Sequence, residues 1–172
     1  MSDDGWTIRP VRPDDAPALR QMREEAGWDM EKVPEWIDAS LAGERPTWVA
    51  ELGGETVGMV SLELVDRDPE VANGNDVAAV TSLSVLSSAA RRGIGRALTV
   101  FAEEQARARG VHVLTLNTRP TNAAALALYR GLGYRRWKQQ ERSWGLAVFL
   151  RKTLGPPWTA DHKIATAAAM IR

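Results

Sequence analysis

Cysteine is absent from this chain of 172 residues, and histidine occurs only twice, at His112 and His162. Without cysteine the chain can form no disulfide and has no thiol nucleophile. That composition fits a reducing compartment, so we expect a cytoplasmic protein. Because cysteine and a His-x-x-x-His spacing are both missing, we expect no metal site, and no zinc site in particular.

Long apolar runs and an excess of charge of either sign are missing as well. No stretch approaches membrane-spanning length, and the acidic, polar residues 1–5 are unlike a signal peptide. The formal net charge is +0, so no global basic field attracts nucleic acid. We therefore expect neither a membrane nor nucleic acid as a partner.

The periodicity of apolar residues predicts a mixed α/β fold. Helical patterns cover residues 14–26, 33–42, 93–109 and 121–132. Strand-like patterns cover residues 7–12, 47–52, 55–64, 78–86, 111–117, 134–139 and 143–150. We expect a single domain over residues 1–154.

A C-terminal tail follows at residues 155–172, where apolar spacing would suit a short helix. It either packs on its own domain or frays, or it forms a homodimer contact through Trp158.

A glycine-rich turn between a strand and a helix is the most informative feature of the chain. It reads Arg91-Arg92-Gly93-Ile94-Gly95-Arg96-Ala97 and follows the strand-like residues 80–86. The unpaired N–H groups and positive dipole of a helix N-terminus favour phosphate, and glycine permits close approach. Leu98 stands where a dinucleotide fingerprint needs its third glycine, and the Gly-Lys-Ser/Thr of a Walker loop is absent.

What remains resembles the pyrophosphate-binding segment of the GNAT superfamily of N-acetyltransferases, Arg/Gln-x-x-Gly-x-Gly/Ala. Gly93 and Gly95 occupy its glycine positions, whereas Ala90 departs from its first position. A second strand, Asn122 and then a Leu-Tyr-x-x-x-Gly-Tyr pattern ending at Tyr134 follow at the expected distance. The resemblance covers about residues 6–153 and implies a mixed, mostly antiparallel central sheet of about seven strands with helices on both faces.

The resemblance also implies acetyl-CoA as the cofactor and assigns residues to it. Backbone groups of Leu83 and Val85 would pair with its pantetheine arm, and an N–H near Val85 would polarise the thioester carbonyl. Asn122 is either a pantetheine contact or an ordinary polar residue of a first helical turn. The phosphates would be held by Arg91, Arg92, Gly93, Ile94, Gly95, Arg96 and Ala97.

Tyr129 is the predicted proton donor to the leaving thiolate. The alternative is that a tyrosine at this place positions the thioester without donating a proton. A phenol has a reference pKa of about 10 and stays protonated at neutral pH. Many relatives place the base early on the central strand, where this chain has Thr81 and Ser82. Glu63, Asp76 and a water chain are the alternatives, and Glu63 is the one we expect to be catalytic.

The acceptor is expected between the first two helices, their link and the final hairpin. An acidic, aromatic-walled pocket there would suit a cationic amine, and Trp28 and Glu25 are the predicted substrate contacts. The alternative is an exposed acidic helix face with buried tryptophans. The residues concerned are Glu24, Glu25, Asp29, Glu31, Trp28 and Trp36.

Together these features predict direct transfer of acetyl from acetyl-CoA to a primary amine of a small molecule or peptide, through a ternary complex. The alternative is a non-catalytic acyl-CoA-binding sensor or assembly module of the same fold.

Overall fold

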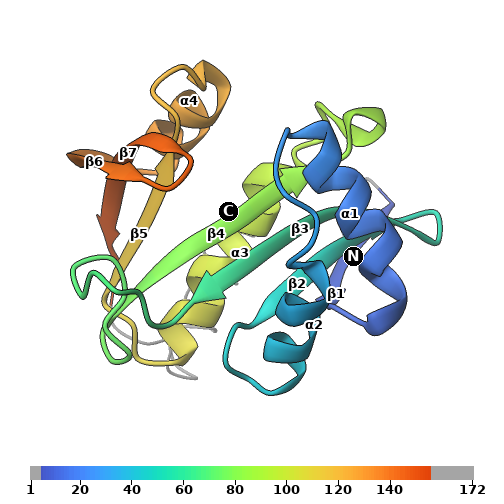
Figure 1. Ribbon diagram of the computed structural model, residues 1–172, viewed down its shortest axis with the longest axis horizontal. Helices are drawn as coiled ribbons and strands as arrows, with labels where there is room; N and C mark the ends of the chain where they lie inside the picture. The colour runs from blue at the N-terminus through green and yellow to red at the C-terminus, as the bar shows by residue number, and fades with distance from the viewer. Residues whose placement is uncertain (1–4, 156–172) are drawn as a thin grey trace, which may run out of the picture.

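The computed structural model describes residues 5–155, which contain a seven-stranded sheet and its covering helices (Figure 1). The strands are β1 (Trp6–Pro10), β2 (Thr47–Leu52), β3 (Glu55–Glu63), β4 (Val77–Val85), β5 (Val113–Thr118), β6 (Arg135–Arg142) and β7 (Gly145–Thr153). Their order across the sheet is β1-β2-β3-β4-β5-β7-β6. Only the β4–β5 pair is parallel, so the prediction of a mixed, mostly antiparallel sheet is confirmed.

Helices cover both faces of this sheet, as predicted (Figure 1). They are α1 (Ala16–Glu25), α2 (Val33–Leu41), α3 (Ile94–Ala108) and α4 (Ala123–Gly131), with short 3-10 turns η1 (Pro13–Asp15) and η2 (Ser87–Ala89). The long helix α3 packs very closely on β3. A Cβ at Gly58 would lie only 3.0 Å from Leu98 Cδ1 and 3.2 Å from Ile94 Cγ2, so a larger residue here would force these side chains to shift.

The N-terminal helix begins later than its pattern predicts, because residues 13–15 form the separate turn η1. The Asp15 carboxylate accepts a hydrogen bond from the Arg12 N–H at 2.7 Å and two from the Arg9 guanidinium, each at 2.8 Å. Thr56 Oγ1 on β3 donates a further bond of 2.6 Å to Asp15. One buried carboxylate therefore fixes β1, the helix start and β3 relative to one another.

The two halves of the sheet separate along β4 and β5. These strands pair only from Val77–Val113 to Ala79–Thr115, and from Val80 onward β4 has no strand partner on that side. Two β4 residues, Ser82 and Leu83, stand opposite the single residue Val60 of β3. A bulge of this kind bends and twists its strand. The result is a gap between β4 and the β5, β7, β6 half, with α4 on the far side (Figure 1).

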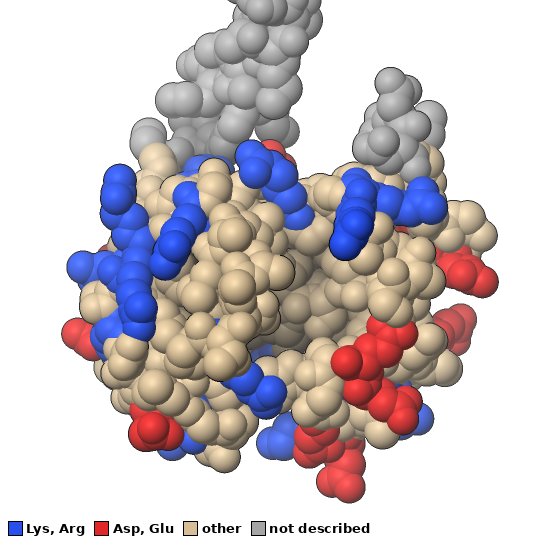
Figure 2. Space-filling view, turned by 90° about the horizontal axis from the view of Figure 1, so that it is seen from above, with Lys and Arg blue, Asp and Glu red and all other residues tan. Residues whose placement is uncertain are grey.

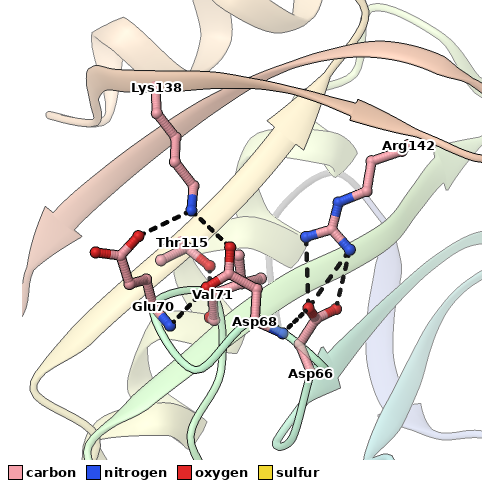
Figure 3. Close-up of polar contacts among 7 residues, drawn as sticks. All are labelled: Asp66, Asp68, Glu70, Val71, Thr115, Lys138 and Arg142. Carbon is pink, nitrogen blue, oxygen red and sulfur yellow. Dashed lines mark hydrogen bonds and ion pairs between the residues drawn. The ribbon is translucent and has the colours of Figure 1, made fainter.

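The loop between β3 and β4 is anchored to the half of the sheet that consists of β5, β7 and β6. Thr115 Oγ1 on β5 donates a 2.8 Å hydrogen bond to the Val71 carbonyl. Val71 also joins Ala79, Ala147 and Phe149 in a small second core. Lys138 on β6 binds Asp68 and Glu70, so three strands hold this loop in place (Figure 3).

The described part of the chain has no helix long and apolar enough to span a bilayer. The predicted tail helix and the contact through Trp158 lie outside the described residues.

Candidate active site

A cavity of about 510 Å³ occupies the gap between β4 and β5. That size falls in the range of small-molecule sites. The lining comes from most of β4, the ends of β3 and β5, one face of α4, the β3–β4 loop and the β6–β7 turn. Further lining residues come from α1, the α1–α2 link and α2. Figure 2 shows the surface hollow, with Lys and Arg side chains on several sides of it.

The β4 bulge forms one wall of this cavity. Ser82 has a φ of 54°, a left-handed conformation that is uncommon for a residue other than glycine. Arg45 holds the bulge from the α2–β2 connection: its Nη2 donates to Thr81 Oγ1 and to Ser82 Oγ, each at 3.0 Å. Strained backbone of this kind is found mainly at functional sites. Nothing in the identity of Ser82 or Arg45 signals this arrangement in the sequence.

The predicted backbone contacts of β4 lie where the strand is unpaired. Leu83 lines the cavity. Val85 packs instead toward the start of α3, since a Cβ at Gly95 would lie 3.8 Å from Val85 Cγ2 and 4.0 Å from Leu128 Cδ2. The end of β4, the first turn of α3 and α4 therefore converge at one end of the cleft.

The glycine-rich turn adopts the geometry that its glycines suggest. Gly93 is the N-cap of α3 with a φ of 77°, and Arg91 has a φ of 63°. The first-turn N–H groups of α3 have no carbonyl acceptor within the helix. The Ile94 side chain is buried against β3, so Ile94 can bind a ligand only through its backbone. The side chains of Arg91, Arg92 and Arg96 are exposed around this turn, and Ala97 is half-buried.

One face of α4 contributes Asn122, Ala125, Leu128 and Tyr129 to the cavity. Asn122 is the N-cap of this helix, because its Oδ1 accepts the Ala125 N–H at 3.1 Å. Tyr129 is only 7% exposed, and burial raises the pKa of its phenol to about 12. This phenol keeps its proton at neutral pH.

Glu63 is a half-buried carboxylate of the cavity, at the end of β3. Burial raises the pKa of Glu63, and neighbouring Asp66 adds to the rise, while Arg45 and Arg142 oppose it. Asp76, the alternative base, serves the loop instead. Its carboxylate accepts from Asn73 Nδ2 at 2.7 Å, and its carbonyl accepts from the His112 N–H.

Trp28, Trp36 and Trp144 line the end of the cavity away from α3. Trp28 and Trp144 contact edge to face, with ring centroids 5.3 Å apart. Trp144 was not singled out by the sequence, because the final hairpin brings it to Trp28 from a distant part of the chain.

The acidic wall predicted for this end is not formed by the residues proposed for it. Among residues 5–155, the cavity lining includes none of Glu24, Glu25, Asp29 and Glu31. The Glu25 carboxylate instead accepts from the Ser87 N–H at 3.0 Å and the Ser87 hydroxyl at 3.4 Å. Glu25 therefore stabilises the turn that follows β4. The α1 residue that lines the cavity is Arg23.

Comparison with known proteins identifies the family. The model of the acetyltransferase (GNAT) family matches residues 14–134. A mycothiol acetyltransferase of Amycolatopsis mediterranei is 30% identical over 142 residues, covering 77% of this chain and 47% of that protein. An aminoglycoside N(6')-acetyltransferase type 1 of Klebsiella aerogenes is 29% identical over 139 residues, covering 77% of this chain and 91% of that protein.

Solved structures agree with the family match. A ribosomal-protein-alanine N-acetyltransferase of Brucella melitensis superimposes with a TM-score of 0.74 and 28% identity, covering 86% of this chain and 99% of that one. The chain belongs to the GNAT acetyltransferase family. It spans about half the length of several curated relatives that it matches.

Acetyl-CoA is the acetyl donor of this family, and the residues of the cleft fit it. The unpaired edge of β4 offers backbone groups to the amides of a pantetheine arm. Gly93 has a left-handed φ and no side chain, so phosphate oxygens can approach the N-terminus of α3. Arg91, Arg92 and Arg96 are close by in the chain.

Proposed function

We propose that this protein is an acetyl-CoA-dependent N-acetyltransferase that transfers acetyl directly to a primary amine in a ternary complex. The observation that carries the proposal is that Glu63 and Tyr129 line one cavity, beside the unpaired, bulged part of β4. A carboxylate with a raised pKa is a suitable base for this chemistry, and a phenol that stays protonated at neutral pH is available as a proton donor. When bound, acetyl-CoA supplies the acetyl group as an activated thioester.

In this proposal Glu63 is the general base. An amine enters largely as its ammonium form, which has no lone pair for attack. The raised pKa of Glu63 makes its carboxylate a stronger proton acceptor than an exposed glutamate, while Arg45 and Arg142 still favour the ionised form. Glu63 removes the ammonium proton directly or through one water.

Tyr129 is the proposed general acid. Because burial keeps its proton in place, the phenol can donate from Oη to the departing thiolate. Backbone N–H groups of β4 near Val85 would polarise the thioester carbonyl, and those of Leu83 and Val85 would pair with pantetheine amides.

The phosphates of acetyl-CoA are assigned to the first turn of α3, formed by Gly93, Ile94, Gly95 and Ala97 with Arg91, Arg92 and Arg96. The Asn122 side chain, which lines the cavity, adds a polar contact to the pantetheine arm.

A non-catalytic acyl-CoA-binding module is the less favoured alternative. It would have no need of a carboxylate in the cavity. Glu63 lines the cavity from β3 and is the carboxylate that the enzyme hypothesis uses as its base. Relatives named for mycothiol and for aminoglycosides favour a small-molecule acceptor, whereas the structural neighbour named for a ribosomal-protein alanine favours a peptide amine. The cysteine-free composition supports a cytoplasmic location.

Release of CoA thiol, measured with a disulfide reagent in the presence of acetyl-CoA and a panel of primary amines, tests the proposal. The chain has no cysteine, so the protein itself adds no thiol signal. Mass spectrometry should find the acetylated amine. Intact protein incubated with acetyl-CoA alone should carry no acetyl group on a catalytic side chain. Tight acetyl-CoA binding without turnover across a broad panel would favour the module.

A further inference from the structure

The acceptor end of the cavity is basic. We use this name for the part of the lining that comes from α1, the α1–α2 link, α2, the β3–β4 loop and the β6–β7 hairpin. Its residues are Arg23, Trp28, Trp36, Asp66, Arg67, Val71, Arg142, Ser143 and Trp144, with three arginines and one carboxylate among them. Two more arginines contact its tryptophans: Arg45 stacks on Trp36, and Arg119 stacks on Trp28.

Two of the tryptophans at this end, Trp28 and Trp36, already stack with arginines of the chain. The Arg23 and Arg45 guanidiniums lie 4.5 and 4.7 Å from the Trp36 ring centroid. Arg119 lies 4.4 Å from the Trp28 ring centroid. These contacts use the ring faces that would attract a cationic ligand. An acceptor with only positive charge would compete with these guanidiniums and would meet the positive charges of Arg23, Arg67 and Arg142 in the lining.

Most of these arginines have no carboxylate partner. Among the described residues, Arg23, Arg45, Arg67 and Arg119 form no salt bridge, and Arg23 donates instead to the Asp29 backbone carbonyl at 2.8 Å. Burial lowers the pKa of Arg23 and of Arg45, because their charges are partly removed from water. The charge of Asp29 acts on Arg23 and that of Glu63 acts on Arg45, but within the described residues neither pair is in salt-bridge contact. Partly desolvated cations in this state favour an anionic ligand.

The carboxylates of the cavity do not neutralise this end. Among the described residues, the only carboxylates in the lining of the whole cavity are Glu63 and Asp66. Asp66 is engaged by Arg142 at 3.4 Å and accepts the Asp68 N–H at 2.8 Å (Figure 3). Glu63 is the proposed base. The positive charges of Arg23 and Arg67 thus remain for a ligand.

We propose, on the basis of the acetyltransferase function above, that the acceptor is an amine that also carries a carboxylate, as amino acids do. Its carboxylate binds Arg23 and Arg67, and its amine points toward Glu63. A guanidinium can hold a carboxylate with two parallel hydrogen bonds, which fixes orientation as well as adding affinity. The arginines would thereby select amino acids over amines of similar shape without an acidic group.

Paired substrates test this proposal. Several L-amino acids are each compared with their α-carboxamides at saturating acetyl-CoA, with CoA thiol release as the readout. The amide has the less basic amine, so intrinsic reactivity at neutral pH favours the amide. We expect kcat/KM to be at least about tenfold higher for the acid, a difference of about 1.4 kcal/mol. Equal values, or higher values for the amides, would overturn the proposal.

Variants locate the anion site. Arg67→Gln alters an exposed loop residue, and Arg23→Gln is a second variant from a different element. Each should reduce the acid-to-amide ratio of kcat/KM at least about fivefold. Arg20→Gln is the matched control, because it removes the same charge from an exposed position on α1. Unchanged ratios in both test variants, or an equal fall in the control, would contradict the assignment.

A binding measurement separates this inference from the proposed function. Calorimetry compares the affinity of the wild-type protein for an amino acid and its carboxamide, with CoA present. Acetylation of acids and amides at equal rates leaves the enzyme function intact and overturns the anion site. Tighter binding of the acid with no acetylation of any amine supports the anion site and overturns the enzyme function. If no amine is acetylated and the acid binds no more tightly than the amide, both the enzyme function and the anion site are overturned.

Discussion

Replacement of Glu63 by glutamine is the perturbation that most directly tests the proposed base. Glu63→Gln keeps the shape of the side chain and removes its capacity to accept a proton. General bases contribute about 10²- to 10⁴-fold to rate. We expect turnover near neutral pH to fall about a hundredfold, which is about 2.7 kcal/mol of transition-state stabilisation.

The loss should depend on pH in a defined direction. The acidic limb of the wild-type kcat/KM profile should lie above the range of an ordinary glutamate, because burial raises the pKa of Glu63. In Glu63→Gln that limb should vanish. Its activity should then climb with pH as the free amine becomes available, and approach wild-type activity near the pKa of the amine.

Stability provides an independent check, because Glu63→Gln should lower activity without lowering stability. A group whose pKa is raised on folding binds its proton more tightly in the folded state. Wild-type stability therefore falls as pH rises from the ordinary glutamate pKa through the raised one. Glutamine removes that cost, so the Tm of Glu63→Gln at pH 7 should equal or exceed that of the wild type.

The matched control is Glu55→Gln, an exposed glutamate at the opposite end of β3. It should retain the wild-type rate and pH profile. An equal loss of activity in Glu63→Gln at every pH, or a loss accompanied by a lower Tm, would mean that Glu63 acts structurally.

Two further predictions concern the cofactor turn and the N-terminal ion pair. Gly95→Asp places a carboxylate at the proposed phosphate site and should raise the Kd for acetyl-CoA at least about tenfold by calorimetry. Gly95→Ala should bind nearly normally, since its Cβ meets only ordinary contacts at 3.8 and 4.0 Å, and equal affinity in both variants would refute the site. Asp15→Asn breaks a buried pair with Arg9 and should lower the free energy of unfolding by about 3 kcal/mol at pH 7 in urea. Folding lowers the pKa of Asp15, so this difference should shrink as pH falls below the ordinary aspartate range, and a constant difference would count against it.

The sequence predicted the elements that depend on local pattern. The strand, glycine turn and helix around Gly93 are consecutive, and their apolar spacing and the left-handed preference of glycine were enough to predict the turn. Tyr129 was located by its place in a helix that follows a recognisable motif. Glu63 was selected as one of few carboxylates near the central strand, and the fold brings it into the same cavity.

The acceptor end could not be predicted because it depends on long-range contacts. Arg119 and Trp144 reach Trp28 from segments far away in sequence, and no local spacing signals such pairs. Glu25 was expected in the pocket, but the rotation of α1 about its axis turns it to Ser87. The left-handed Ser82 was also missed, since a bulge at serine has no distinctive residue pattern.

The most direct test of the central claim is the turnover of Tyr129→Phe measured together with its acetyl-CoA affinity on the same folded preparation. Phenylalanine keeps the buried ring, including its edge contact with Tyr134 at 6.0 Å between centroids, and deletes only the hydroxyl. The account predicts that turnover falls about a hundredfold or more while the Kd for acetyl-CoA changes little. Near-full turnover in this variant would contradict the account, and loss of acetyl-CoA binding would make Tyr129 a binding residue.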